Sequence, residues 1–368
     1  MDAQAASRVR REIARLSHAG LDLAAFFRDA GRILRKAVPF EAACWHTLDP
    51  ATLLETSHLV ENLPLENPRA AEIEYLYDDY NQFVALARGP RTVGILREAT
   101  GGVPERSRRY RELIRPLGLD AELRGAFVSG SAGWGAVGLL REPGSPPFSA
   151  AESRFLGSVS GYLAHGVRTA LLLSAAAAPD AAERGPGLVL FDDRQRLEAM
   201  TPAADELLGE LIDAPRTRSE PGMLPYVVHA VASRAALVAR SGAPDAPARA
   251  RVRTRAGRWL VLNGSVMAGA PSTRIAVIVE EAPPPTVAPL VAGAYGLSSR
   301  EREVMVHMLR GSSTKEIADA LRISAHTVQE HFKAIFDKVG VRSRRELVGR
   351  IFFRHFAGPV GADAPGRR

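Results

Sequence analysis

Three side chains near the C-terminal end of the sequence can hydrogen-bond the edges of DNA bases. Gln329, Glu330 and Lys333 share one face of a predicted helix with His326 and Asp337. In a major groove, Gln pairs with adenine, Glu accepts from the cytosine amino group and Lys donates to guanine. The solvated face of a small helical bundle would show the same pattern, so this stripe alone leaves both interpretations open.

The opposite face of this predicted helix is apolar and should pack against a core. Its residues recur at helical spacing and are Val328, Phe332, Ile335, Phe336 and Val339. A short segment with a compact apolar set (Ile317, Ala318 and Leu321) precedes it, across a tight connection at 322–323. A short helix, a tight turn and a longer two-faced helix are typical of helix-turn-helix geometry.

Serine residues mark where the helices around this pattern should begin. Three of them precede a glutamate by three residues, which is the capping-box pattern, and a fourth precedes a threonine. Gly311 and Gly340 stand where the first and third helices should end. The sequence predicts four helices at about 299–310, 314–321, 325–339 and 344–356. The serine pairs are Ser298/Glu301, Ser313/Glu316, Ser343/Glu346 and Ser324/Thr327.

This stretch resembles the LuxR/NarL-type (GerE-like) C-terminal DNA-binding domain. The resemblance implies an all-α four-helix domain at 289–358 whose third helix is the recognition helix. Gln329 departs from the family pattern, which usually has Lys after Thr-Val, so the resemblance implies no particular DNA sequence. The matching residues are Leu297, Ser299 to Glu301, Glu303, Val304, Gly311, Lys315 to Ala318, Leu321, Ser324, Thr327, Val328, His331, Ile335, Lys338, Gly340, Val341, Arg344, Glu346 and Leu347.

The helix-turn-helix interpretation assigns roles to further side chains. The residues expected to approach the bases are Thr327, Gln329, Glu330 and Lys333. Those expected to hold phosphates are Ser313, Thr314, Lys315, Lys338 and Arg344. The apolar face of the fourth helix exceeds what a minimal core requires, and the resemblance implies that it forms a dimer contact through Val348, Ile351 and Phe352. The alternative is that Val348 belongs to the domain's own core.

The length and charge of the chain fit a short basic segment attached to a larger region of low net charge. The chain has 368 residues, which suggests two or three domains, and a formal charge of +7. Residues 295–356 hold twelve Lys or Arg against seven Asp or Glu, so +5 of that charge lies in this short segment. A basic segment of this kind suits contact with double-stranded DNA.

Several classes of site and protein find no support in the sequence. A single cysteine, Cys44, excludes an internal disulfide and a CxxC metal motif, and the nine His show no HExxH spacing. We find no Walker A motif and no GxSxG elbow. We therefore expect no metal site, no cofactor and no enzymatic activity. The longest apolar run, at 170–178, is too short to span a bilayer, and no signal peptide is evident, so we expect a cytoplasmic protein without membrane contact.

The first region, 1–175, resembles a GAF-like sensory domain with an N-terminal helix. Residues 8–37 predict one or two helices broken at Gly20, and 39–48 predict a strand. A helical middle at 69–87 precedes paired strands at 125–128 and 134–140, and a helix from about 149 to 173 closes the region. The resemblance implies a small-molecule pocket, for which the candidates are Cys44, Trp45, Phe127 and Trp134, with Tyr75, Tyr77 and Tyr80. Core packing is the alternative role for each.

The second region, 186–283, resembles a PAS-like domain after a linker at 174–186. Residues 187–197 predict a strand, a turn and a second strand, and further strands are predicted at 250–255, 258–266 and 274–280, with a helix beginning near Thr201. That Thr stands where the family commonly has Asn. Arg249, Arg251, Arg253 and Arg255 alternate along one strand face, which indicates a solvated outer face or, alternatively, docking to an acidic surface or DNA. Residues 281–288 predict a stiff extended linker.

The sequence as a whole predicts an α+β multidomain protein: a sequence-specific, dimeric transcriptional regulator with sensory domains ahead of its DNA-binding domain. Its expected partners are double-stranded DNA, a second copy of the chain, RNA polymerase and an unidentified small-molecule effector. The alternative is a small-molecule-sensing signalling module in which DNA contact is secondary. A catalytic role for the first 280 residues is the least favoured hypothesis.

Overall fold

The computed structural model describes residues 3–64, 68–130, 132–173, 185–213, 223–242, 247–267 and 273–355. The side chains of residues 3, 172, 173, 284, 285 and 350–355 are outside that description. The chain divides into two compact units. The first holds residues 1–173, 185–252 and 260–280, and the second holds 253–259 together with the chain from 281 onward.

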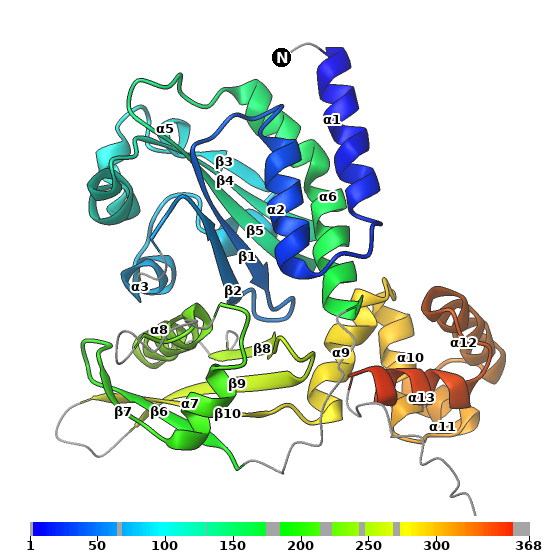
Figure 1. Cartoon of the computed structure of the whole chain (residues 1–368). Helices are drawn as coiled ribbons and strands as arrows, with labels where there is room; N and C mark the ends of the chain where they lie inside the picture. Colours follow the sequence, from blue (N-terminus) through cyan, green and yellow to red (C-terminus); the bar gives the residue numbers. More distant parts are fainter. Residues whose placement is uncertain are drawn as a thin grey trace, which may run out of the picture. The chain divides into compact units, whose positions relative to one another are not determined.

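The first unit contains two five-stranded sheets (Figure 1). Sheet A has the order β2-β1-β5-β4-β3 and is antiparallel throughout. Its strands are β1 (Ala42–Leu48), β2 (Glu55–Glu61), β3 (Val93–Ile95), β4 (Ala121–Ser129) and β5 (Ala132–Arg141). Strand β1 lies between β2 and β5, and its His46 is paired with His58 of β2 and with Ala136 of β5.

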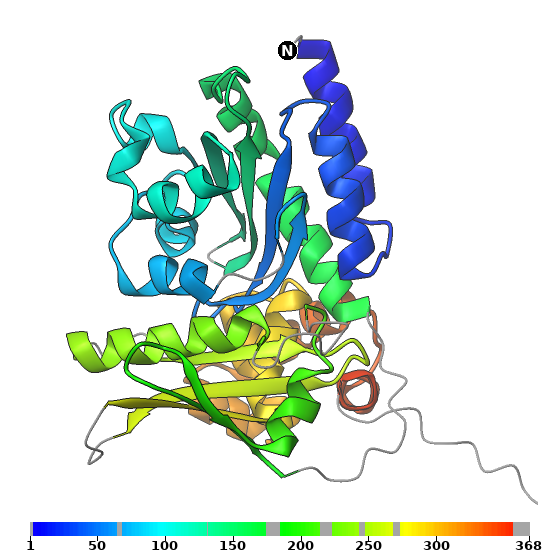
Figure 2. The ribbon, with the colours of Figure 1, turned by 60° about the vertical axis from the view of Figure 1, so that its left-hand side comes forward.

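One face of sheet A is apolar and is covered by three helices, α1 (Ala3–Leu16), α2 (Leu23–Leu34) and α6 (Ala150–Leu173), which lie together in Figures 1 and 2. Trp45 stacks on Phe27 of α2 at 5.4 Å between ring centroids. Gly166 of α6 lies so close to Phe26 that a Cβ there would come within 2.1 Å of the ring. Ser149 and Glu152 bond each other's amides at the start of α6, as their spacing predicts.

The other face of sheet A carries charged residues and is covered by shorter segments, α3 (Pro68–Leu76), α4 (Phe83–Arg88) and α5 (Leu96–Ala99) among them. Two short 3-10 turns, Pro104–Arg106 and Arg115–Leu117, flank a π-helical turn, Tyr110–Ile114. Because successive side chains of a strand point to opposite faces, the same strand β1 gives Trp45 to the apolar side and His46 to this polar side.

Sheet B has the order β7-β6-β10-β9-β8, and β6 pairs antiparallel with both β7 and β10. The strands are β6 (Gly187–Phe191), β7 (Leu197–Met200), β8 (Arg249–Arg253), β9 (Trp259–Met267) and β10 (Arg274–Glu281). Two helices accompany them, α7 (Pro202–Leu208), which Thr201 caps through Ala204, and α8 (Tyr226–Ser241). A mixed α/β region with two sheets, as predicted, therefore precedes a helical C-terminal segment.

Several elements, among them α5 and the short turns between residues 104 and 117, were not predicted from the sequence, and one predicted linker was wrong. Strands β2 and β3 were not predicted, and α8 was missed because residues 226–235 are all buried and show no amphipathic period. The predicted extended linker at 281–288 instead enters helix α9 (Pro284–Ala294). Proline is tolerated in the first turn of a helix, where its missing N–H would have had no partner. Of the predicted linker at 174–186, residues 174–184 lie outside the described residues.

The arginine stripe of β8 is not a solvated face, which corrects the preferred sequence interpretation. Arg251 is 9% exposed and Arg253 is 7% exposed, whereas Arg255 is exposed. Asp49, which follows β1 and is itself 1% exposed, accepts from the Arg251 backbone N–H at 3.0 Å and from its Nε at 2.8 Å. This buried ion pair joins the end of β1 in sheet A to β8 in sheet B.

We predict that Arg251→Met lowers the free energy of unfolding by about 3–5 kcal/mol, because it leaves the buried Asp49 carboxylate without its cation. The matched control is Arg274→Met on β10, whose exposed ion pair with Glu198 at 2.6 Å should contribute little. Urea unfolding followed by circular dichroism measures both. Equal losses in the two variants would contradict a special role for the Asp49–Arg251 pair.

Candidate nucleic-acid interface

The C-terminal helices begin at the predicted caps. They are α10 (Ser299–Leu309), α11 (Thr314–Leu321), α12 (Ala325–Val339) and α13 (Arg344–His355), close to the predicted bounds. Ser298 and Ser313 form complete capping boxes with Glu301 and Glu316. At α13 the capping box is shifted by one residue. The Ser343 side chain accepts from the Glu346 backbone N–H, but the Glu346 carboxylate accepts from the backbone N–H of Arg342 and not from that of Ser343.

The apolar stripe of α12 packs into a core that all four helices share, as predicted. Val328 and Ile335 are fully buried, and Phe332 stacks on Phe336 at 6.1 Å. The residues of the opposite stripe, which we call the recognition face, are all exposed: His326, Gln329, Glu330, Lys333 and Asp337. The buried core residues are Ala292, Leu297, Val304, Met305, Met308, Ile317, Ala318, Val328, Phe332, Ile335, Val339, Val341 and Leu347.

A tight turn sets the direction of α12 relative to α11. Arg322 ends α11 in the left-handed conformation, with φ of 53°, and the Ile323 amide donates to the Ala318 carbonyl at 3.0 Å. Arg300 of α10 donates to the Leu321 carbonyl. This carbonyl lies in the last turn of α11, where carbonyl groups have no hydrogen-bond partner within the helix. Ser324 then caps α12 through the Thr327 amide at 3.0 Å.

The predicted phosphate contacts at the start of α11 lie beside the recognition face. Ser313 and Lys315 are exposed, and Thr314 is half-buried. The Gln329 side-chain amide donates to Thr314 Oγ1 at 3.3 Å, so one polar contact joins a predicted base-reading residue to a predicted phosphate-binding residue. The first turn of α11 also presents backbone N–H groups, which favour anions.

The two other predicted phosphate contacts, Lys338 and Arg344, have internal partners. Lys338 Nζ donates to both carboxylate oxygens of Glu301, at 2.8 and 2.6 Å. Burial opposes ionisation of Glu301, but Lys338 and the Ser298 cap outweigh it and hold the pKa of that carboxyl below its usual range. Arg344 donates to the Met308 carbonyl at 3.0 Å, near the end of α10. Their phosphate-binding role stays a prediction.

Helix α13 leaves one of the predicted dimer-contact side chains in solvent. Val348 is 36% exposed, whereas its neighbour Leu347 is fully buried in the core. The alternative that Val348 belongs to the domain's own core is therefore not what the structure shows. Ile351 and Phe352 lie within α13, but their side chains are outside the described set.

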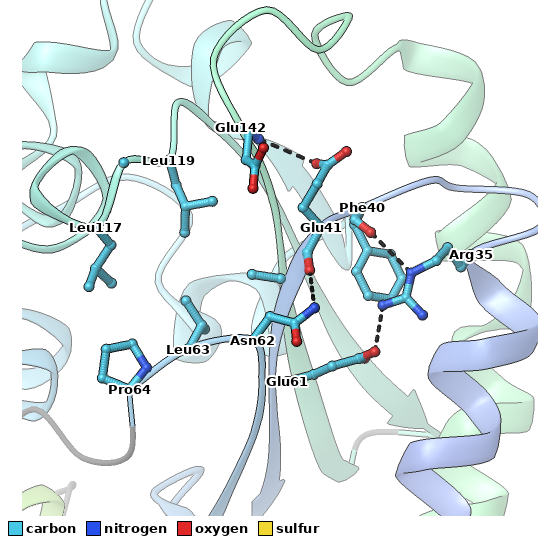
Figure 3. Close-up of a pocket in the computed structure, with 12 residues that line it drawn as sticks. Arg35, Phe40, Glu41, Glu61, Asn62, Leu63, Pro64, Leu117, Leu119 and Glu142 are labelled. Carbon is cyan, nitrogen blue, oxygen red and sulfur yellow. Dashed lines mark hydrogen bonds and ion pairs between the residues drawn. The ribbon is translucent and has the colours of Figure 1, made fainter.

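The predicted ligand-pocket residues divide between two environments in the first unit. Cys44 lines a cavity of about 180 Å³ on the polar face of sheet A. Trp45 lies on the opposite face, 6.1 Å from the Phe127 ring, and Trp134 is 1% exposed. A second, more polar cavity of about 530 Å³ is bordered by three carboxylates, those of Glu41, Glu61 and Glu142 (Figure 3).

Sequence reasoning missed the polar residues that accompany Cys44 in its cavity. His46 Nδ1 pairs with Glu55 at 3.0 Å, and the His46 ring stacks on His58 at 4.7 Å. Burial alone would lower the pKa of His46, but the Glu55 carboxylate raises it to about 10. Burial and the nearby His46 lower the pKa of His58 to about 3. The signal was the Cys-x-His spacing at 44 and 46, which puts both side chains on one strand face.

Comparison with known proteins bears on the C-terminal helices. Residues 296–350 match the family model of "Bacterial regulatory proteins, luxR family". A probable HTH-type transcriptional regulator, GfsR of Streptomyces halstedii, is 39% identical over 57 residues, which are 16% of this chain and 24% of that protein. The transcriptional regulatory protein TdiR of Thauera aromatica is 44% identical over 52 residues, 14% of this chain and 23% of that protein.

The matched segment spans about a quarter of each relative's length. A solved complex of Vibrio cholera VqmA with a ligand and DNA aligns at 18% identity over 48% of this chain and 85% of that one, with a TM-score of 0.22. None of the described helices is long and apolar enough to cross a membrane. The match in residues 296–350 coincides with the four-helix arrangement, and this part of the chain is a helix-turn-helix domain of the luxR family of bacterial regulatory proteins.

Proposed function

We propose that the protein is a transcriptional regulator that binds duplex DNA as a dimer, with α12 in the major groove. The observation that carries this proposal is the division of α12 into a buried stripe and an exposed recognition face. The residues proposed to approach the bases include Gln329, Glu330 and Lys333, all exposed. An amide, a carboxylate and an ammonium together can distinguish base pairs by their donor and acceptor patterns.

The turn between α11 and α12 supports the same proposal. Two contacts from α10 hold these helices: Arg300 bonds the Leu321 carbonyl at the end of α11, and Glu301 accepts from Lys338 in the last turn of α12. A recognition helix needs this rigidity because base readout depends on side chains reaching defined atoms. Ser313, Thr314 and Lys315 at the start of α11 would then meet the phosphate backbone, which supplies most of the salt-dependent affinity.

The two sheets of the first unit form the proposed sensory part. The element order around sheet A, with helices on both faces and α6 at its end, supports a GAF-like domain. The order around sheet B supports a PAS-like one. A small-molecule effector would bind in the first unit, and the DNA-bound dimer would act on RNA polymerase in the cytoplasm. If DNA contact were secondary, as in the alternative of a sensing module, the protein would not be retained on DNA at moderate salt.

We predict that Gln329→Ala relaxes base preference at one position of the bound sequence by about 1–3 kcal/mol. Selection of bound sequences from a random duplex library measures this change. Lys333→Ala should weaken binding, while Lys36→Ala, which removes an exposed lysine of the first unit, serves as the charge-matched control. An unchanged selected sequence for Gln329→Ala would remove that residue from base readout.

We predict that a fragment beginning at Glu281 folds alone and binds DNA, and that it is more stable than one beginning at Gly296. The reason is that Ala292 of α9 is fully buried in the core shared by α10 to α13, and Tyr295 packs against that core. Thermal unfolding of the two fragments compares their stability. A fragment from Glu281 without helical content would show that these helices need the rest of the chain.

We predict that Val348→Glu leaves the C-terminal fragment folded but weakens binding to a two-half-site operator more than to a single half-site. Val348 is exposed, so its loss should not open the core, whereas a charge buried between two copies would be desolvated without a partner. Circular dichroism checks folding, and titration with both operators checks binding. Equal effects on both operators would rule out a dimer contact at this position.

A further inference from the structure

Strands β1 and β2 bring three metal-binding side chains together on the polar face of sheet A. Cys44 and His46 are two residues apart on β1, so they point to the same face. His58 lies directly opposite His46 on β2. One ligand atom from each of the three side chains lies within 4.8 Å of the others. The rings of His46 and His58 are stacked with an interplanar angle of 15°.

The cluster contains a buried histidine and a buried carboxylate that form an ion pair with each other. His46 is 4% exposed and Glu55 is 1% exposed. Among the described residues, His46 Nδ1 and both carboxylate oxygens of Glu55 have no hydrogen-bond partner of good geometry. The ion pair at 3.0 Å between Nδ1 and Glu55 occupies that edge of the ring. Nε2 of His46 is therefore the ring nitrogen that can serve a further partner.

We propose that Cys44, His46 and His58 bind a divalent transition-metal cation of the Zn²⁺ class, with Glu55 as the residue that positions His46. This site is independent of the DNA-binding function proposed above. It departs from the expectation of no metal, which rested on the missing CxxC and HExxH motifs. The ligands here come from a strand pair rather than from such a local motif.

The donor set selects the class of metal. One thiolate and two imidazoles favour Zn²⁺ and its neighbours over Mg²⁺ or Ca²⁺, which prefer oxygen ligands. A carboxylate that holds the other nitrogen of a ligating histidine is the usual arrangement around zinc, because it orients the ring and raises its basicity. A metal-bound Cys44 would be a thiolate, and with the Glu55 carboxylate it would carry two negative charges, which a divalent cation balances.

The surroundings give the metal a route and an open position. Three protein ligands leave the fourth tetrahedral position vacant, as in sites that take a water or a small ligand. The cavity of about 180 Å³ lined by these side chains has room for such a group. Leu63, Pro64 and Leu117 border both this cavity and the larger cavity of Figure 3. There Arg35 pairs with one of the three carboxylates at 2.6 Å, so a cation approaching from that side would meet the other two.

Titration of the full chain with Co²⁺, after removal of metals and with the thiol kept reduced, tests the proposal. Cys44 is the chain's single cysteine, so any sulfur-to-cobalt charge-transfer absorption comes from this site. We expect one Co²⁺ per chain, with that absorption and the visible bands of tetrahedral cobalt, and displacement of the cobalt by Zn²⁺. Cys44→Ser should abolish the charge-transfer band, and Glu55→Gln should weaken affinity about 10–100-fold.

The matched control is His165→Gln, because His165 also pairs with a second histidine, His18, at 3.1 Å, but in an exposed position. His58→Gln should lose tetrahedral cobalt binding, and His165→Gln should keep it. Circular dichroism confirms that each variant is folded, and protection of the Cys44 thiol from alkylation by bound Zn²⁺ gives a readout in the unaltered chain. Absence of the charge-transfer band in the unaltered chain, or equal loss of binding in both histidine variants, would overturn the proposal.

Discussion

A charge removed from water needs partners, and the polar face of sheet A is organised around that requirement. Arg124 pairs with Glu74 at 2.9 Å, and Arg109 pairs with Glu122 at 2.8 Å, all with side chains that are 10% exposed or less. These pairs tie β4 to α3 and to the π-helical turn. They also fix the wall of the cavity in which His46 and Glu55 lie. Breaking one pair would leave its partner charged and buried, so the arrangement tolerates little change.

The same requirement operates on a smaller scale in the helix-turn-helix domain. Glu301 caps α10, is 6% exposed and receives both short hydrogen bonds from Lys338. Its carboxylate therefore joins the start of α10 to the last turn of α12. The position of α12 therefore depends on contacts to α10, and Gln329 adds one contact to α11 through Thr314.

The proposed metal cluster lies where elements of both sheets converge within the first unit. The ring centroid of His58 lies 5.0 Å from that of Tyr226, the first residue of α8. The backbone N–H of His58 donates to the Asp213 carboxylate at 3.1 Å. Burial raises the pKa of Asp213 to about 6. The cluster thus contacts the long buried helix that packs on sheet B, while Asp49 and Arg251 join the two sheets independently. A ligand bound here would touch residues far apart in the sequence.

The sequence by itself determined the helix-turn-helix domain, because caps, glycines and a two-faced stripe are local signals: Ser298, Ser313 and Gly340 act within one helical turn of where they stand. It also placed most strands of both sheets. Only the tertiary structure decided what the buried charges do. Arg251 pairs with Asp49 across 202 positions of the chain, and His58 meets His46 only because β2 pairs with β1. Local periodicity reports which face a side chain occupies, whereas the partner that makes a buried charge stable is set by strand pairing and packing between distant segments.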